Sequence, residues 1–184
     1  EAGGFAGAWL PSAGHDAMTV LALAGAATSS IELGTFVQAS YSRHPVSMAQ
    51  GALAVQAASG NRFVLGIGLS HKRVIEDSWG LDFSRPVRHM SEYLQVLAPL
   101  LRGEKVDFEG ELFRIHSRIQ VPDATAPPII VAALGPQMLR MAARHADGTA
   151  LWMAGPKYVR EVVVPEMSRA AASAGRPSPR VIAG

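Results

Sequence analysis

Two short segments place small residues directly after apolar runs, where the backbone could bind an anionic group. Gly66-Ile67-Gly68 ends one run and is followed by Leu69-Ser70-His71, and Ala132-Ala133-Leu134-Gly135-Pro136 ends another. Small residues at a strand end leave backbone N–H groups accessible, and a helix that begins at Pro136 would direct its free amides back toward that end. We predict that both segments contact the phosphate end of a cofactor, although close packing and ordinary turns would use the same residues. The candidate contacts are Gly68, Leu69, Ser70, Ala132, Ala133, Leu134 and Gly135.

His71 is the candidate acid or base. It follows a predicted strand end, where barrel enzymes place their catalytic groups, and an imidazole exchanges protons near neutral pH. The other histidines, at positions 15, 44, 89, 116 and 145, form neither a His-x-x-x-His nor a His-Glu-x-x-His pattern, and the chain has no cysteine. We therefore predict no metal site and no thiol chemistry. His89 and His145 fall in helix-like segments, where we expect surface or packing roles.

Other catalytic patterns fit poorly. A dinucleotide fingerprint would need glycine at position 71 and an acidic residue at the end of the next strand, which is about 60 residues away. A hydrolase nucleophile elbow would need glycine at position 72, which is lysine.

Trp9 and Trp152 lie near the ends of two apolar runs. They either pack in the core or form the wall of a substrate pocket that holds a flat ring.

Apolar runs alternate with helix-like segments about five times, which indicates β-α units. The runs are nearly continuous rather than alternating with polar residues, as in strands covered on both faces, so we predict a parallel α/β sheet or barrel. Residues 106–115 alternate around Glu109-Gly110 and predict a β-hairpin. The predicted strands cover residues 6–10, 31–37, 63–69, 128–134, 148–153 and 180 onward, and the predicted helices cover 16–28, 45–59, 86–102, 136–146 and 157–174.

Composition narrows the class of protein. The chain has 184 residues, 48% of them hydrophobic, a mean hydropathy of +0.16 and a formal charge of +2, without a run long enough to span a membrane. No basic cluster with aromatic residues predicts a nucleic-acid partner. We expect one cytoplasmic domain over residues 1–184. The chain lacks an initiator Met, starts like the tail of a helix and ends on an opening strand, so we expect an interior fragment of a longer protein.

Three further segments carry a resemblance to a known family. They are Ile31-Glu32-Leu33-Gly34-Thr35-Phe36-Val37, Arg43-His44-Pro45 and Gly60-Asn61-Arg62-Phe63-Val64-Leu65-Gly66-Ile67-Gly68, supported by residues 131–136 and 146–148. The chain resembles the luciferase-like monooxygenase superfamily, and within it the branch that depends on the deazaflavin coenzyme F-420. The resemblance implies an incomplete (β/α)8 TIM barrel that contains strands two to seven and a hairpin insertion. It also implies a non-prolyl cis peptide at Phe36 and Val37, which supports the cofactor ring.

The resemblance implies an oxidoreductase that transfers hydride between F-420 and a small organic substrate. An FMN-dependent monooxygenase is the alternative, and an inactive barrel that acts as a binding protein is another. Relatives that are dehydrogenases place a histidine where this chain has residues 10–14, and an acid that aligns with His71. The resemblance therefore does not transfer their chemistry, and reductase, dehydrogenase and monooxygenase directions stay open. The partner implied is a small-molecule substrate, and the sequence leaves a homodimer open.

Overall fold

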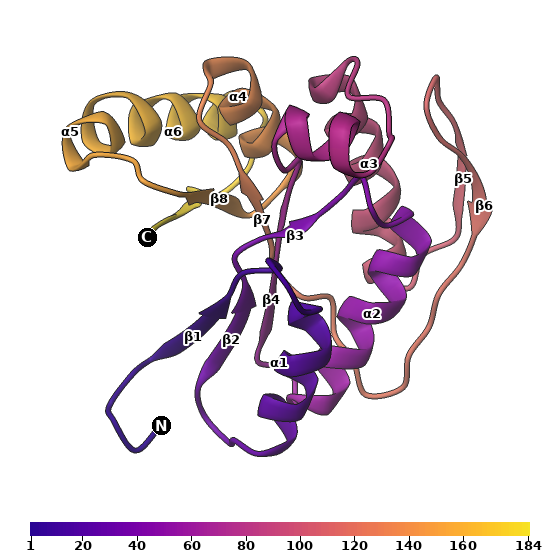
Figure 1. Ribbon diagram of the computed structural model, residues 1–184, viewed down its shortest axis with the longest axis vertical. Helices are drawn as coiled ribbons and strands as arrows, with labels where there is room; N and C mark the ends of the chain where they lie inside the picture. The colour runs from indigo at the N-terminus through magenta and orange to yellow at the C-terminus, as the bar shows by residue number, and fades with distance from the viewer.

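The sheet is a strongly curved layer of parallel strands. The computed structural model describes all residues, 1–184, and shows the sheet with its helices on the outside (Figure 1). Neighbouring strands follow the order β1-β2-β4-β7-β8-β9, all parallel, so β1 and β9 are the unpaired edges. This is the predicted incomplete barrel. The strands are β1 Gly7–Leu10, β2 Glu32–Thr35, β4 Phe63–Gly68, β7 Ile129–Ala132, β8 Gly148–Leu151 and β9 Arg180–Ala183, and the short β3, Gln38–Ala39, pairs with the end of β4.

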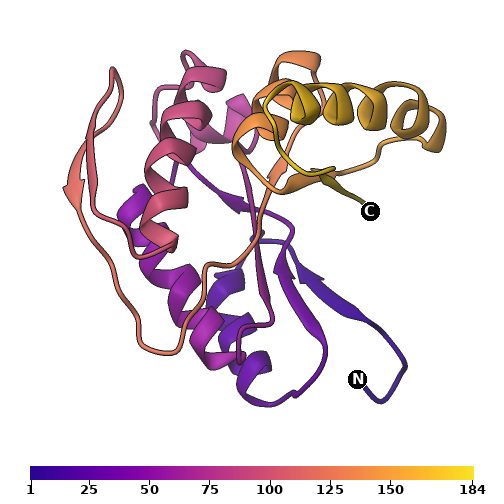
Figure 2. The same cartoon turned by 180° about the vertical axis from the view of Figure 1, so that it is seen from behind.

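The connections between neighbouring strands of the order above contain helices that pack on the convex face of the sheet (Figure 2). Three helices begin with a proline as predicted: α2 with Pro45, α3 with Pro86 and α4 with Pro136. Proline is tolerated there because an N–H in the first turn has no acceptor within the helix. The helices are α1 Ala17–Ala26, α2 Pro45–Ala58, α3 Pro86–Leu101, α4 Pro136–His145, α5 Pro156–Tyr158 and α6 Val164–Ser173. Two π-helical turns, η1 Val74–Ser78 and η2 Val159–Val163, complete the set. No helix combines the length and apolar character that a membrane crossing requires.

Alternate residues of the strands face two separate cores. Leu65 and Ile67 belong to a cluster of 35 buried residues between the sheet and the helices. On the concave face, Val64, Ile130 and Ala150 form a small cluster with the partly buried aromatic residues there. The concave side is therefore a second apolar environment, and it corresponds to the interior of a closed barrel. The candidate site lies on this side, at the carboxyl ends of the strands.

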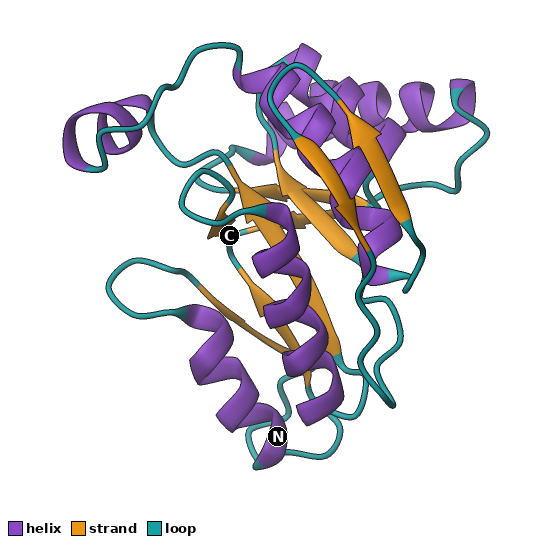
Figure 3. Ribbon diagram, turned by 90° about the vertical axis from the view of Figure 1, so that its right-hand side faces the viewer, coloured by secondary structure: helices purple, strands orange, loops and turns teal.

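The predicted hairpin forms and is tied to α3. Strands β5 Val106–Glu109 and β6 Arg114–Ser117 pair antiparallel and stand beside the helices, facing the viewer in Figure 3. The Glu92 carboxylate, on α3, is 3% exposed and accepts N–H bonds from residues 111, 112 and 113 at 3.1, 2.9 and 3.2 Å. A side chain at Gly110 would overlap this carboxylate. The insertion thus depends on one buried charge and one glycine.

The first six residues are not helical, which corrects the expectation of a helix tail. They form a turn and an extended approach to β1. The Glu1 carboxylate accepts N–H bonds from Ser29, Ser30 and Ile31 at 2.7, 2.6 and 3.0 Å. Those backbone N–H groups lower the pKa of Glu1 to about 2. The segment is held by the loop before β2 rather than by helical hydrogen bonds.

Candidate functional site

The junction between β2 and β3 contains the cis peptide bond that the resemblance implied, between Phe36 and Val37. Beside it, the buried Thr35 hydroxyl donates to the Gly66 carbonyl oxygen at 2.6 Å and accepts the Gly66 N–H at 2.9 Å. A Cβ at Gly66 would overlap the Thr35 carbonyl oxygen. Glycine at this position therefore allows β2 and β4 to approach closely where the strand is interrupted.

An open pocket of about 500 Å³ lies at the carboxyl ends of the strands, directly above this junction. It joins the ends of β4 and β7, so the two predicted anion-binding segments lie on the same rim, as expected. Most of its lining is apolar, and Ser70 and His71 are its polar members. Its lining residues are Phe36, Val37, Gly68, Leu69, Ser70, His71, Ala132, Ala133, Leu134, Met138, Ala150 and Trp152.

His71 lies at the exposed edge of the pocket, and its ring forms no hydrogen bond or ion pair with the protein. Ser70 before it has a left-handed backbone (φ 64°), which turns the chain sharply at the end of β4. The His71 carbonyl then accepts the Ile75 N–H at 3.0 Å, and Ile75 is fully buried. The imidazole is thus carried by an anchored turn and is free to contact a ligand.

Two predicted residues lie outside the pocket lining. Trp9 pairs in register with Gly34, two residues before Phe36 on the neighbouring strand, so it lies deeper on the concave face. Its ring packs edge-on to Phe36 at 6.4 Å, and the Arg180 guanidinium lies 5.5 Å from its centroid. Trp9 therefore supports Phe36 and does not form the pocket wall. Gly135 precedes α4 as its N-cap and also does not line the pocket.

Trp152 does form part of the wall, and two lining residues were not predicted. The Trp152 ring lies 5.9 Å from that of Phe36 and is 64% exposed. Ala150 lines the pocket because it faces inward on β8, two residues before Trp152, and Met138 enters from the first turn of α4. Two patterns in the sequence could have identified them. Ala150 lies two residues before Trp152 and so faces the same side of the strand, and Met138 lies three residues after Gly135, in the first turn of the helix.

The pocket fits the flat ring of a flavin or deazaflavin. Glycine at position 68 leaves space at the bottom of the pocket for the ring. A Cβ there would lie 2.7 Å from Val37 Cγ2 and 3.1 Å from the Ala132 Cβ. No lysine or arginine lines the pocket, so a charged tail would have to leave it. At the rim, α4 starts without a side-chain cap, and its first amides have no intrahelical acceptor. The Tyr158 hydroxyl holds the loop in place by donating to the Leu134 carbonyl at 2.7 Å.

A buried cluster beneath the same rim has a structural role. His89 stacks on Tyr41 with centroids 3.9 Å apart, and its Nε2 lies 3.1 Å from the Ser40 hydroxyl. Burial lowers the pKa of His89 to about 4 and, with the nearby Asp82 charge, raises the pKa of Tyr41 to about 12. His89 is the packing residue that the helical segment predicted.

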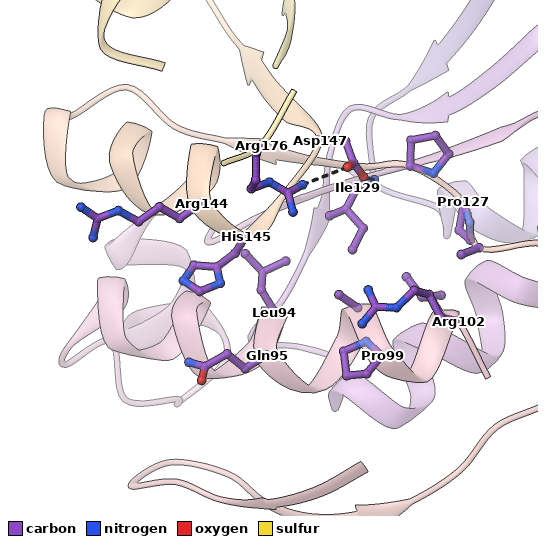
Figure 4. A pocket seen from close by; sticks show the side chains of 14 residues that line it. Leu94, Gln95, Pro99, Arg102, Pro127, Ile129, Arg144, His145, Asp147 and Arg176 are labelled. Atoms are coloured by element: carbon purple, nitrogen blue, oxygen red, sulfur yellow. Dashed lines mark hydrogen bonds and ion pairs between the residues drawn. The ribbon is translucent and has the colours of Figure 1, made fainter. Parts of the chain in front are cut away.

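A larger hollow, of about 640 Å³, lies at the opposite ends of the strands (Figure 4). Barrel enzymes carry their chemistry at the carboxyl ends of the strands, so size alone does not make it the active site. The pocket that contains His71 is the candidate active site.

The comparisons with known proteins agree with this geometry. The family model for luciferase-like monooxygenases matches residues 1–184. An uncharacterised Mycobacterium tuberculosis protein is 32% identical over 96% of this chain and 55% of its own. The 5,10-methylenetetrahydromethanopterin reductase of Methanolobus tindarius is 31% identical over 88% of this chain and 48% of its own. The solved coenzyme F420 dependent tetrahydromethanopterin reductase of Methanopyrus kandleri is 29% identical, with a TM-score of 0.83 over 98% of this chain and 57% of that one.

This chain spans about half the length of the curated relatives it matches. The family match nevertheless covers every residue of it, and the relatives share both its sequence and its fold. The chain belongs to the luciferase-like monooxygenase family.

Proposed function

We propose that the protein is an oxidoreductase that transfers hydride between coenzyme F-420 and a small organic substrate. The observation that carries the proposal is the largely apolar pocket formed by the ends of β4 and β7, with His71 at its edge. The Methanopyrus kandleri reductase, whose title states dependence on coenzyme F420, supports the choice of cofactor. The pocket has no lysine or arginine in its lining, which suits the uncharged part of a fused ring system of either cofactor.

In this proposal the chain supplies binding, orientation and proton transfer, and F-420 supplies the hydride chemistry when it is bound. Phe36, Val37 and Ala150 contact one side of the ring and fix its depth in the pocket. Trp152 and Leu134, both exposed at the mouth, lie against the edge of the bound ring, and the ring and substrate themselves displace water from the pocket. These groups hold the substrate carbon within transfer distance of the ring.

His71 moves the proton that accompanies hydride transfer. When the substrate carbonyl is reduced, its oxygen takes a proton from an imidazole nitrogen of His71; in the reverse direction that nitrogen accepts the hydroxyl proton. The imidazole ring of His71 has no hydrogen-bond partner in the protein that a substrate would have to displace. The same arrangement serves a reductase or a dehydrogenase.

The proposal is tested by titrating the full-length protein with F-420 and FMN side by side. We expect saturable binding of F-420, seen as a change in its absorbance near 420 nm, and weaker binding of FMN. Gly68→Val should abolish binding by filling the pocket floor. Ala58→Val is the matched control, because Ala58 is exposed at the end of α2, which precedes the amino-terminal end of β4 and lies away from the pocket.

Each alternative has its own outcome. Preference for FMN would overturn the choice of F-420 and favour the monooxygenase. A folded protein that binds neither cofactor would overturn the oxidoreductase proposal and favour a binding protein. Unchanged binding of F-420 by Gly68→Val would show that the pocket is not the binding site.

A further inference from the structure

The larger hollow lies between α3 and the amino-terminal ends of β7 and β8. Figure 4 shows α3 forming one wall, while the end of α4 and the turn before β9 form the other. Ile129 begins β7 and Asp147 immediately precedes β8, whereas the candidate active site lies beyond the other ends of these strands. The two hollows are therefore separated by the length of the strands, and no residue lines both.

Its lining carries a surplus of positive charge. Three arginines, Arg102, Arg144 and Arg176, line it with one carboxylate, that of Asp147, while Glu104, which pairs with Arg102, lies outside the lining. Both Asp147 oxygens are already engaged: one accepts the Ile129 N–H at 2.8 Å, and the other pairs with Arg176 Nη2 at 3.1 Å. Each oxygen thus has one of its two acceptor sites occupied, but Asp147 supplies only one negative charge among the arginines of the lining.

Each arginine retains free donors. Arg176 uses Nη2 alone, which also donates to the Ala146 carbonyl at 2.9 Å. Arg102 uses Nε and Nη2 on Glu104, at 2.6 and 3.1 Å, which leaves Nη1. Arg144 forms no hydrogen bond or ion pair. In Figure 4 the heads of Arg102 and Arg176 approach the middle of the hollow from opposite walls, and Arg144 lies at the far end beside His145.

His145 shows the effect of this charge. Its ring has no hydrogen-bond partner in the protein and lies beside Gln95 of α3 (Figure 4). Burial and the positive charges of Arg176 and Arg144 lower the pKa of His145. An anion in the hollow would act in the opposite direction, because a nearby negative charge favours the imidazolium form.

Apolar side chains separate the charged ends. Leu94 and Pro99 of α3 face Ile129 and Pro127 across the hollow. A volume of about 640 Å³ lies in the range of small-molecule pockets, roughly 300–1,000 Å³. A bare inorganic ion would leave most of this apolar wall uncovered.

We propose that this hollow is a second ligand site, distinct from the cofactor pocket, which binds an organic anion. Its phosphate or carboxylate head lies between Arg102 and Arg176, and its apolar body packs against Leu94, Pro99 and Ile129. Planar guanidinium groups with paired N–H donors suit both kinds of head. The site does not depend on the identity of the cofactor or on the reaction at His71.

The test follows the His145 ring by NMR in the full-length protein, with a His145→Gln variant to assign its signal. Phenyl phosphate, benzoate and inorganic phosphate are titrated separately at constant ionic strength. We expect a saturable shift and a raised His145 pKa with phenyl phosphate or benzoate, and at least fivefold weaker binding of inorganic phosphate. The tighter of the two organic anions identifies the head as a phosphate ester or a carboxylic acid.

Arginine variants distinguish specific binding in the hollow from a general attraction of anions to the positive charge of the protein. Arg102→Gln should weaken binding roughly tenfold or more, because it removes a charged donor. Arg144→Gln should weaken it several-fold without a risk to folding, since Arg144 has no protein partner. Arg73→Gln, at a side chain 93% exposed elsewhere on the surface, is the matched control and should change nothing. No saturable His145 response, or equal weakening by the Arg73 variant, would overturn the site; equal affinity for inorganic and phenyl phosphate would overturn an organic ligand.

Discussion

The Thr35 hydroxyl forms two hydrogen bonds to Gly66, one to its carbonyl oxygen and one from its N–H, and so joins β2 to β4 where the ladder between them is interrupted. Both residues are buried. Val37, on the far side of the junction, lines the candidate active site. The position of the pocket floor therefore depends on a side-chain bridge that replaces backbone pairing.

Gly66→Ala should break this arrangement. The added Cβ would overlap the Thr35 carbonyl oxygen, which is backbone and cannot rotate away. Overpacking of this kind costs about 1–3 kcal/mol and shifts the backbone. We expect that loss in the free energy of unfolding, measured by denaturant titration, together with weaker cofactor binding. Gly155→Ala, where a Cβ meets nothing within 4 Å, should change neither; an unaltered Gly66→Ala protein would contradict the close approach.

Glu92→Gln should release the hairpin from α3. The buried carboxylate accepts three backbone N–H groups, which lower its pKa although burial opposes ionisation. A glutamine amide keeps one acceptor oxygen and brings an NH2 group against backbone donors. Loss of hydrogen bonds to a charged group costs about 1.5–3 kcal/mol.

Amide hydrogen exchange provides the measurement: residues 111–113 should exchange faster in the variant, while the strands of the main sheet stay protected. Glu161→Gln is the control, because that carboxylate is half exposed and pairs only with Arg160 at 3.6 Å. Such an exposed pair contributes at most about 1 kcal/mol. Unchanged exchange at residues 111–113 would show that the hairpin holds without Glu92.

The sequence predicted the fold well because strand and helix periods, prolines at first turns and the Glu109-Gly110 turn are local signals. The same signals placed the ends of β4 and β7, since Gly68 and Ala132 mark points where the backbone must stay accessible. The cis peptide came from the resemblance alone, because neither Phe36 nor Val37 shows it by type.

The sequence could not predict how far along the sheet a side chain lies from the pocket, or which residues distant in the chain contact each other. For Trp9 the sequence left open core packing or the pocket wall, and its register opposite Gly34, two residues before Phe36, decides against the wall. Register depends on which strands pair, and residue patterns along one strand do not contain that information. The anchoring of the hairpin by Glu92 likewise joins residues about 20 positions apart, beyond the reach of helix or strand periodicity.

His71→Ala should affect turnover more than folding. The side chain is exposed and makes few packing contacts, so the free energy of unfolding should fall by about 1 kcal/mol or less. Loss of a positioned acid or base typically lowers turnover by roughly a hundredfold to ten-thousandfold. The comparison is Lys72→Ala, at the neighbouring side chain, which is 69% exposed and pairs with Glu76 at 3.8 Å. If His71→Ala bound cofactor normally and kept near-full activity, the proton would have to come from another histidine or from solvent.

His89 should make the protein less stable as the pH falls. Burial lowers its folded-state pKa to about 4 from an ordinary value of 6.5, so between these values the unfolded chain binds a proton that the folded protein does not. The stability that His89 contributes is therefore complete above pH 6.5 and is lost as the pH falls toward 4, by up to about 1.4 kcal/mol per pH unit.

The measurement is the free energy of unfolding between pH 5 and 6.5, where the carboxylates remain ionised. His89→Phe keeps an aromatic ring against Tyr41 but cannot titrate, so its stability should depend less on pH than that of the wild type. It should also be less stable at pH 7, because the buried Ser40 hydroxyl loses its partner. His145, whose pKa is also lowered, contributes a slope that remains in the variant. His15→Ala, at an exposed site, should keep the wild-type slope, and an equally steep slope in His89→Phe would show that His89 is protonated without cost in the folded protein.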